Sequence, residues 1–158
     1  MPNRHVMSRR IENFTSVEHG GQTCSGVIYH AAEGKHCATV ILMHGLGDSS
    51  DGMASLADVF YIAFPWVKFI LPTATTRPVT MNMGHTMTAW YDIVGLDKRS
   101  NEHCDGIDVS VARIRKLLEE EHATGLPYSR IALAGFSQGA ALSLYTGLQM
   151  DEDKKVSN

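Results

Sequence analysis

The stretch IALAGFSQGAAL, residues 131–142, decides the fold, because an apolar segment leads directly into a glycine-bearing turn and a run of small residues. The segment Arg130–Gly135 has the continuous apolar character of a strand that is buried on both faces. From Gln138 to Met150, small residues and then leucines about one turn apart predict a helix. Residues 135–139 match the pattern G-x-S-x-G, so Ser137 is predicted to lie at the turn between strand and helix.

A serine in this setting can act as a nucleophile. The sharp turn holds its oxygen above the sheet in a strained backbone conformation. Gly135 and Gly139 fit two positions before and after Ser137, since larger side chains would collide with the neighbouring strand and helix. At the start of the helix, the free N–H of Gln138 is placed to bind a developing oxyanion. The alternative is an idle serine, because the five-residue pattern arises by chance in about one chain in twenty of this length.

Strands and helices alternate along the rest of the chain. Cys24–His30 is expected to form an outer strand, Ala38–Met43 a buried strand, and Val67–Leu71 a short strand closed by Pro72. Between the last two, apolar residues about one turn apart predict a helix that Pro65 ends: Met53, Leu56, Ala57, Phe60 and Ala63 or Phe64.

A second helix is predicted after residue 105, with either Asp105 or Asp108 as its N-cap. Gly125 and Pro127 are the signals that end it. From Thr73 to Ser100 neither period holds, and a long ordered loop of this kind is often functional. The pattern predicts an α/β fold with a mainly parallel sheet and helices on both faces, in a single domain over 1–158. We expect residues 1–22 to form an irregular N-terminal segment.

A second glycine-bearing turn, His44-Gly45-Leu46-Gly47-Asp48, follows the buried strand Ala38–Met43. Open α/β sheets place their ligands at this carboxyl edge. Its glycines let a backbone N–H approach a substrate oxygen, and we assign the N–H of Leu46 as the second oxyanion donor. His44 could be a catalytic base, but a structural role in shaping the loop is favoured.

Composition excludes several other classes. The 158 residues include 14 Lys and Arg against 17 Asp and Glu, and this net charge of -3 argues against nucleic acid as a partner. Cys24, Cys37 and Cys104 are widely spaced and form no metal-ligand pattern, so we expect no metal, no cofactor, and free thiols in the cytoplasm. The longest apolar run, Ala38–Met43, is far shorter than the roughly 20 residues of a membrane span, and the N-terminus lacks a secretory signal.

Three stretches resemble the acyl-protein thioesterases and their relatives among the lysophospholipases and carboxylesterases: LMHGLGDSSDGM (residues 42–53), RPVTMNMGHTMTAWYDIVGL (77–96) and GFSQGAALSLYTGL (135–148). The resemblance implies an α/β-hydrolase fold and a serine hydrolase that cleaves acyl thioesters or esters through an acyl intermediate. Its substrates would be S-acylated proteins, lysophospholipids or small esters. The family's nucleophile falls on Ser137, and its oxyanion donors fall on the backbone of Leu46 and Gln138.

By the same resemblance, residues 77–96 cover an acyl-binding groove. The side chains of Met81, Met83, Met87 and Trp90 suit a lipid chain, because methionine adapts its packing to flexible apolar ligands. The alternative for the methionines is simple filling of the core.

The resemblance also implies a triad that runs Ser, then Asp or Glu, then His along the chain. All eight histidines precede Ser137: His5, His19, His30, His36, His44, His85, His103 and His122. The carboxylates after it (Asp151, Glu152 and Asp153) lie beyond a helix and cannot orient an imidazole. Pro2 stands where some relatives carry a lipidated cysteine, so palmitoylation there is not expected.

We therefore expect an α/β-hydrolase domain truncated at its C-terminus, with the strands after the Ser137 helix missing. Two alternatives to an active enzyme stay open. The chain could be a non-catalytic isoform or a fragment that at most binds acyl groups or partners. A second chain could also supply the missing half of the site.

Overall fold

The computed structural model describes residues 10–17, 23–32, 34, 36–97 and 103–156. Its strands are β1 (Ile11–Val17), β2 (Thr23–Tyr29), β3 (Ala38–Met43), β4 (Val67–Thr73), β5 (Thr76–Val79), β6 (His85–Thr88) and β7 (Ile131–Gly135). Its α-helices are α1 (Ser50–Ala63), α2 (Ile107–Ala123) and α3 (Gln138–Leu148). Short 3-10 turns occupy Thr80–Asn82, Tyr128–Arg130 and Glu152–Lys154.

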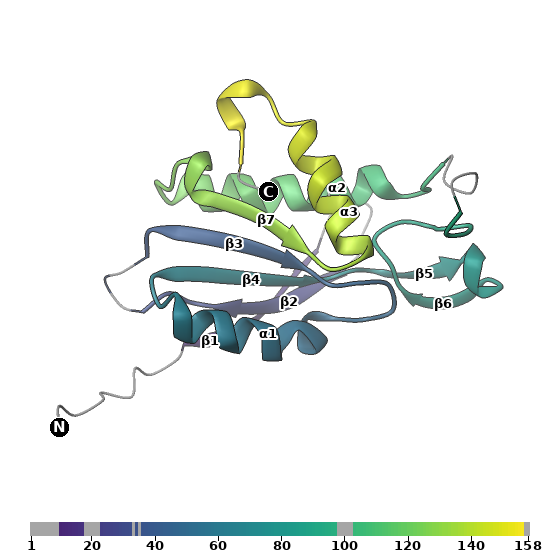
Figure 1. Ribbon diagram of the computed structural model, residues 1–158, viewed down its shortest axis with the longest axis horizontal. Coiled ribbons are helices and arrows are strands. Elements are labelled where there is room, and N and C mark those ends of the chain that lie inside the picture. The colour runs from purple at the N-terminus through teal and green to yellow at the C-terminus, as the bar shows by residue number, and fades with distance from the viewer. Residues whose placement is uncertain (1–9, 18–22, 33, 35, 98–102, 157–158) are drawn as a thin grey trace.

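The large sheet has the strand order β1-β2-β4-β3-β7, and a separate hairpin pairs β5 with β6. β3 runs parallel to both β4 and β7, whereas β2 is antiparallel to β1 and β4. Helix α1 covers one face of this sheet, and α2 and α3 cover the other (Figure 1). The predicted α/β class is therefore confirmed, with the parallel pairing confined to β4, β3 and β7.

Alternate side chains of β3 divide the core between the two faces of the sheet. Ile41 and Met43 pack with α2, α3 and β7, in a cluster that includes Ile114 and Leu142. Leu42 packs on the opposite face with α1 and β4. Because β3 is buried on both faces, its sequence is apolar except at Thr39.

Strand β1 corrects the expectation that residues 1–22 are irregular. Ile11–Val17 pairs with β2 along its whole length, so β2 is an inner strand and not the outer one that we predicted. The ring of Phe14 packs against Gly26, where an added Cβ would come within 2.6 Å of the ring. Ile11 is half exposed, and this shallow burial explains why the sequence of β1 shows no clear apolar alternation.

Helix α1 ends just before Pro65, as predicted, but its buried face is made by Met53, Ala57 and Tyr61. Leu56 is 42% exposed, so the predicted face was partly wrong. Strand β4 also continues past Pro72 to Thr73. Pairing with β3 stops at Ile70, so the missing N–H of proline breaks no bond of that ladder.

The segment between Thr73 and Ser100, expected to be a loop, contains the β5–β6 hairpin. Pro78 pairs with Thr86 within it. These strands have only four residues each, the shortest length over which a period of two can be recognised. The hairpin extends beyond the carboxyl end of β4 (Figure 1).

Helix α2 ends before Gly125 as predicted, but neither Asp105 nor Asp108 caps its start. The N-cap is Gly106, with φ 86° and no side-chain bond. The guanidinium of Arg77 occupies the space where a side chain at this position would lie, and it donates to the carbonyl of Asp105. A tertiary contact therefore overrides the usual preference for a capping side chain.

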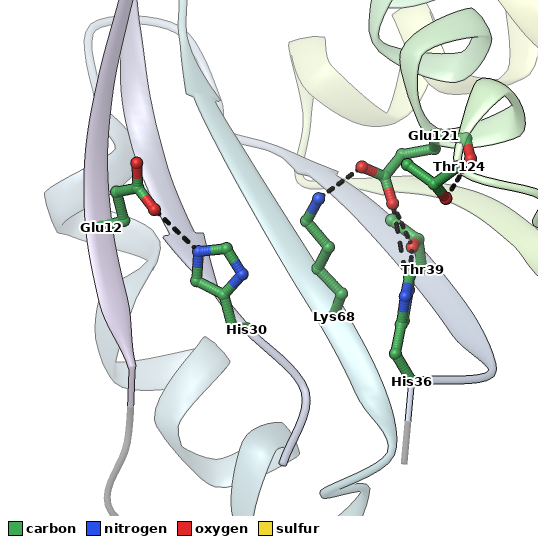
Figure 2. A network of polar contacts seen from close by, with 7 residues as sticks. All are labelled: Glu12, His30, His36, Thr39, Lys68, Glu121 and Thr124. Carbon is green, nitrogen blue, oxygen red and sulfur yellow. Dashed lines mark hydrogen bonds and ion pairs between the residues drawn. The ribbon is translucent and has the colours of Figure 1, made fainter. Parts of the chain in front are cut away.

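A polar cluster of Glu121, Lys68, Thr39 and His36 joins α2 to the sheet near the amino ends of β3 and β4 (Figure 2). The side chain of Glu121 is buried, pairs with Nζ of Lys68 and accepts from Oγ1 of Thr39 at 2.7 Å. Nε2 of His36 lies 2.9 Å from the same hydroxyl. Burial lowers the pKa of His36, although Glu121 acts to raise it.

Within the described parts of the chain, no helix has the length and apolar character of a membrane span. The same parts contain no group of three or more His, Cys, Asp or Glu side chains that could hold a metal ion.

Candidate active site

The pairing of β3 with β7 brings the two predicted turns together. Met43 lies opposite Gly135 at the carboxyl ends of these strands, and the N–H of Phe136 donates to the Met43 carbonyl at 3.0 Å. A Cβ placed on Gly45 would lie 3.5 Å from Cβ of Ser137. The His44–Asp48 loop therefore borders the serine directly.

Ser137 has φ 50° and ψ -115°, in the left-handed half of the map that L-residues rarely occupy. Its side chain is exposed, and α3 begins at the next residue. A Cβ on Gly135 would lie 2.4 Å from the backbone of Gly139, and one on Gly139 would lie 2.4 Å from the carbonyl oxygen of Met43. Both glycines are thus required by close backbone approach, for the reason that the sequence suggested.

The amides around this turn are used unequally. The N–H of Gly47 donates to Thr88, that of Asp48 to Gly45, and that of Gly139 to Phe136. By contrast, no acceptor among the described residues is bonded to the N–H groups of Gly45, Leu46, Ser137 and Gln138. Leu46 and Gln138 are the two of these that the sequence singled out as oxyanion donors.

His44 is fully buried and both of its ring nitrogens are engaged. Nε2 accepts from the N–H of Ala74 at 2.9 Å, and Nδ1 lies 2.6 Å from the carbonyl oxygen of Gly45. Burial lowers the pKa of the ring, and this effect exceeds the opposing effects of the Gly45 carbonyl and Asp48. The structure thus places His44 as part of the loop's framework and leaves it no free nitrogen for a catalytic base.

The side chain of Gln138 has a role that the sequence did not suggest. It is 5% exposed, accepts from the N–H of Trp90 at 2.9 Å and donates to the carbonyl of Tyr91 at 2.8 Å. Nε1 of Trp90 in turn donates to the carbonyl of His44 at 2.8 Å. The only sequence signal was a large amide side chain within a run of small residues.

The predicted groove residues occupy three different environments. Met83 is 84% exposed and Met81 is 37% exposed, so neither fills the core. Met87 is half-buried, with Sδ 3.7 Å from the position of a Cβ on Gly47, which places it beside the loop. The expectation that Trp90 lines the groove was wrong, because its side chain is fully buried. It packs beneath the His44–Asp48 loop inside the protein and offers no surface to substrate.

Polar contacts hold the β5–β6 hairpin near this site. The N–H and hydroxyl of Thr80 donate to the carboxylate of Asp92, and the N–H of Met81 donates to the carbonyl of Ile93. Partial burial acts to raise the pKa of Asp92, but the bonds from Thr80 and Ile93 outweigh it, so the pKa lies below its ordinary value. The carboxylate is therefore a charged anchor near neutral pH.

No described side chain is hydrogen-bonded to the hydroxyl of Ser137. The other histidines with bonds in the structure are engaged elsewhere: His30 with Glu12, His36 with Thr39, His85 with Asn82 and His122 with Leu126. The described residues thus provide a nucleophile and the free amides of Leu46 and Gln138, without a base in contact with the serine.

The sequence profile of the phospholipase/carboxylesterase family matches residues 25–156. The chain belongs to this family. Acyl-protein thioesterase 1 of Schizosaccharomyces pombe is 44% identical to this family member over 113 residues, which are 72% of this chain and 50% of that protein. Acyl-protein thioesterase 1 homolog 2 of Dictyostelium discoideum is 39% identical over 127 residues, covering 79% of this chain and 57% of that protein.

The fold of this phospholipase/carboxylesterase family member is also similar to solved structures. The crystal structure of Zea mays acyl-protein thioesterase 2 aligns with a TM-score of 0.66 and 34% identity, over 76% of this chain and 49% of that one. The chain thus spans about half the length of the curated relatives and of the solved structure that it matches.

Proposed function

We propose that this chain carries the nucleophile half of a serine hydrolase site that cleaves acyl thioesters or esters through an acyl-Ser137 intermediate. The observation that carries the proposal is the strained, exposed serine at the strand–helix turn, beside two amides that donate to no other described residue. Relatives named acyl-protein thioesterases support S-acylated proteins as the substrate class. Lysophospholipids and small esters are the other candidates, and a cytoplasmic location agrees with the free thiols of Cys37 and Cys104.

In the proposed reaction, Oγ of Ser137 attacks the acyl carbonyl carbon and loses its proton, and the carbonyl oxygen becomes an oxyanion. The N–H groups of Leu46 and Gln138 bind this oxyanion, which lowers the barrier because they are already oriented. The tetrahedral intermediate then expels the thiol or alcohol and leaves an ester on Ser137. Water attacks this ester, releases the acid and restores the hydroxyl.

Activation of the serine requires a base, and no described side chain contacts Ser137 in that role. Hydrolases that lose their triad keep a residual rate of about 10³–10⁴ over water from oxyanion stabilisation and binding. We expect the chain alone to act at this reduced level. Exposed Met81 and Met83, with half-buried Met87, would offer the acyl chain an adaptable apolar surface.

The second candidate is a non-catalytic protein that binds acyl groups or partners, and the absence of a base beside Ser137 among the described residues favours it. A fluorophosphonate probe separates the two, because it forms a covalent bond only with a reactive serine. We expect purified chain to be labelled slowly at Ser137, Ser137→Ala to be unlabelled, and Ser129→Ala, at an exposed serine outside the site, to be labelled at the same slow rate as the parent. Equal lack of labelling in all three would refute the hydrolase proposal and leave the binding role.

A further inference from the structure

Three buried side chains connect the turn that contains Ser137 to the His44–Asp48 loop from inside the protein. His44, Trp90 and Gln138 are exposed by 0%, 0% and 5%, so none of them offers a surface to substrate. Gln138 holds the backbone of residues 90 and 91, and Trp90 holds the carbonyl of His44. The turn that contains Ser137 is thereby joined to the loop that contains Leu46 by hydrogen bonds that do not involve the serine.

The orientation of the Leu46 amide depends on the peptide that it shares with Gly45. In a planar trans peptide the C=O and the N–H point in opposite directions. The Gly45 carbonyl accepts from Nδ1 of His44 at 2.6 Å and from the N–H of Asp48 at 3.2 Å. Holding this oxygen toward His44 therefore turns the N–H of Leu46 away from the imidazole.

The surroundings of His44 also decide which nitrogen carries the proton. Because Nε2 accepts from the amide of Ala74, the single proton of the neutral ring lies on Nδ1, where it can be donated to Gly45. The groups that face the ring are Asp48 from its own loop, Arg113 from α2, and the indole of Trp90, whose centroid is 5.1 Å from that of the imidazole. Arg113 in turn lies over the Trp90 ring at 5.6 Å.

We propose that His44 is a positioning residue whose Nδ1–H donation to the Gly45 carbonyl aims the Leu46 amide at the oxyanion position, with Trp90 and Gln138 fixing the distance between the two turns. This inference rests on the proposed function for its effect on rate. The geometry of the ring and of the Gly45–Leu46 peptide can be tested without any activity.

Two variants separate the hydrogen bonds of His44. In His44→Asn, the amide nitrogen occupies the place of Nδ1 and can still donate to Gly45, while the bond from Ala74 is lost. In His44→Gln, the longer side chain places its oxygen near Nε2 and can accept from Ala74, while donation to Gly45 is lost. Each variant removes one buried hydrogen bond, so the two should unfold at similar temperatures.

The first measurement is the rate at which a fluorophosphonate modifies the serine. His44→Asn should retain most of the rate of the parent, and His44→Gln should be about a hundredfold slower, as for the loss of one oxyanion donor. The inference would be overturned if the modification rates followed the thermal stability of the variants and not the presence of a donor to the Gly45 carbonyl.

The second measurement is nitrogen-15 NMR, which does not depend on a reactive serine. The parent should show a protonated Nδ1 and an unprotonated Nε2, and the amide signal of Leu46 should shift in His44→Gln but stay near its parent position in His44→Asn. A ring protonated on Nε2, or a Leu46 signal that is indifferent to both changes, would overturn the inference. If the parent is never labelled but these NMR results hold, the proposed function fails and the positioning role stands.

Discussion

Replacing Glu121 with alanine should destabilise the fold strongly, because the carboxylate is the shared partner of the cluster in Figure 2. Its side chain is 5% exposed and pairs with Lys68, whose side chain is 16% exposed. Removing one partner of a buried pair leaves the other charge without compensation and costs about 3–5 kcal/mol. Since Lys68 keeps some access to water, we expect the lower end of that range, about 3 kcal/mol.

The hydroxyl of Thr39 adds to this cost. It donates to Glu121 at 2.7 Å and would lose this acceptor, a loss of about 1.5 kcal/mol, the low end for a hydrogen bond to a charged group. His36 lies within 2.9 Å of the same hydroxyl and can take over as acceptor, which offsets part of the loss. The expected total for Glu121→Ala is therefore about 3–4 kcal/mol.

Urea unfolding followed by tryptophan fluorescence measures this change directly. The matched control is the double variant Lys68→Met with Glu121→Leu, which removes both charges and keeps apolar volume, and should lie within about 1 kcal/mol of the parent. Glu119→Ala, at an exposed carboxylate on the same helix, should change little. A cost below about 1 kcal/mol for Glu121→Ala, or a double variant as unstable as the single one, would refute the reasoning.

Two further predictions concern the site and its pH dependence. Gly139→Ala should cost several kcal/mol or prevent folding, because the new Cβ meets the Met43 carbonyl at 2.4 Å. In the same urea assay, Gly84→Ala should cost only about 1–2 kcal/mol, because open space surrounds Gly84 and only its left-handed backbone is strained. The pKa values of His36 and His44 are both lowered below 6.5 on folding, so the unfolded chain binds more protons and the free energy of unfolding should fall as the pH drops below about 6.5. Urea titrations at several pH values between about 7.5 and 5 should show the free energy of unfolding falling with pH, and this dependence should be weaker in His36→Asn. A free energy of unfolding that does not change with pH would contradict the prediction.

The sequence predicted the elements whose burial is complete and failed where burial is partial. Strand β3 is covered on both faces, and β7 buries Ile131 and Leu133 almost completely, so their apolar runs were unambiguous. Strand β1 lies at the edge of the sheet with little burial. Its Phe14–Gly26 contact depends on the pairing partner, so the strand's own pattern does not reveal it. The N-cap of α2 was missed for a related reason, because Arg77 comes from a distant part of the chain.

Some features of the candidate site could likewise be predicted from the sequence and others could not. The position of Ser137, the two glycines and the adjacent loop followed from the local motif, since each is a requirement of backbone geometry. The inward turn of the Gln138 side chain and the burial of Trp90 could not be predicted, because each depends on the partner that the other supplies. A tryptophan in a methionine-rich stretch suggested a surface for lipid, and its indole N–H instead found a carbonyl inside the protein.

The backbone of Ser137 also affects how this chain would respond to selection. A residue other than glycine at φ 50° and ψ -115° costs about 1–3 kcal/mol, which the surrounding turn must supply. Glycine at this position would relax the strain and remove the nucleophile in one step. A screen of variants for heat resistance alone would therefore favour loss of the hydroxyl, so any search for hardier forms of this protein must select for serine reactivity at the same time.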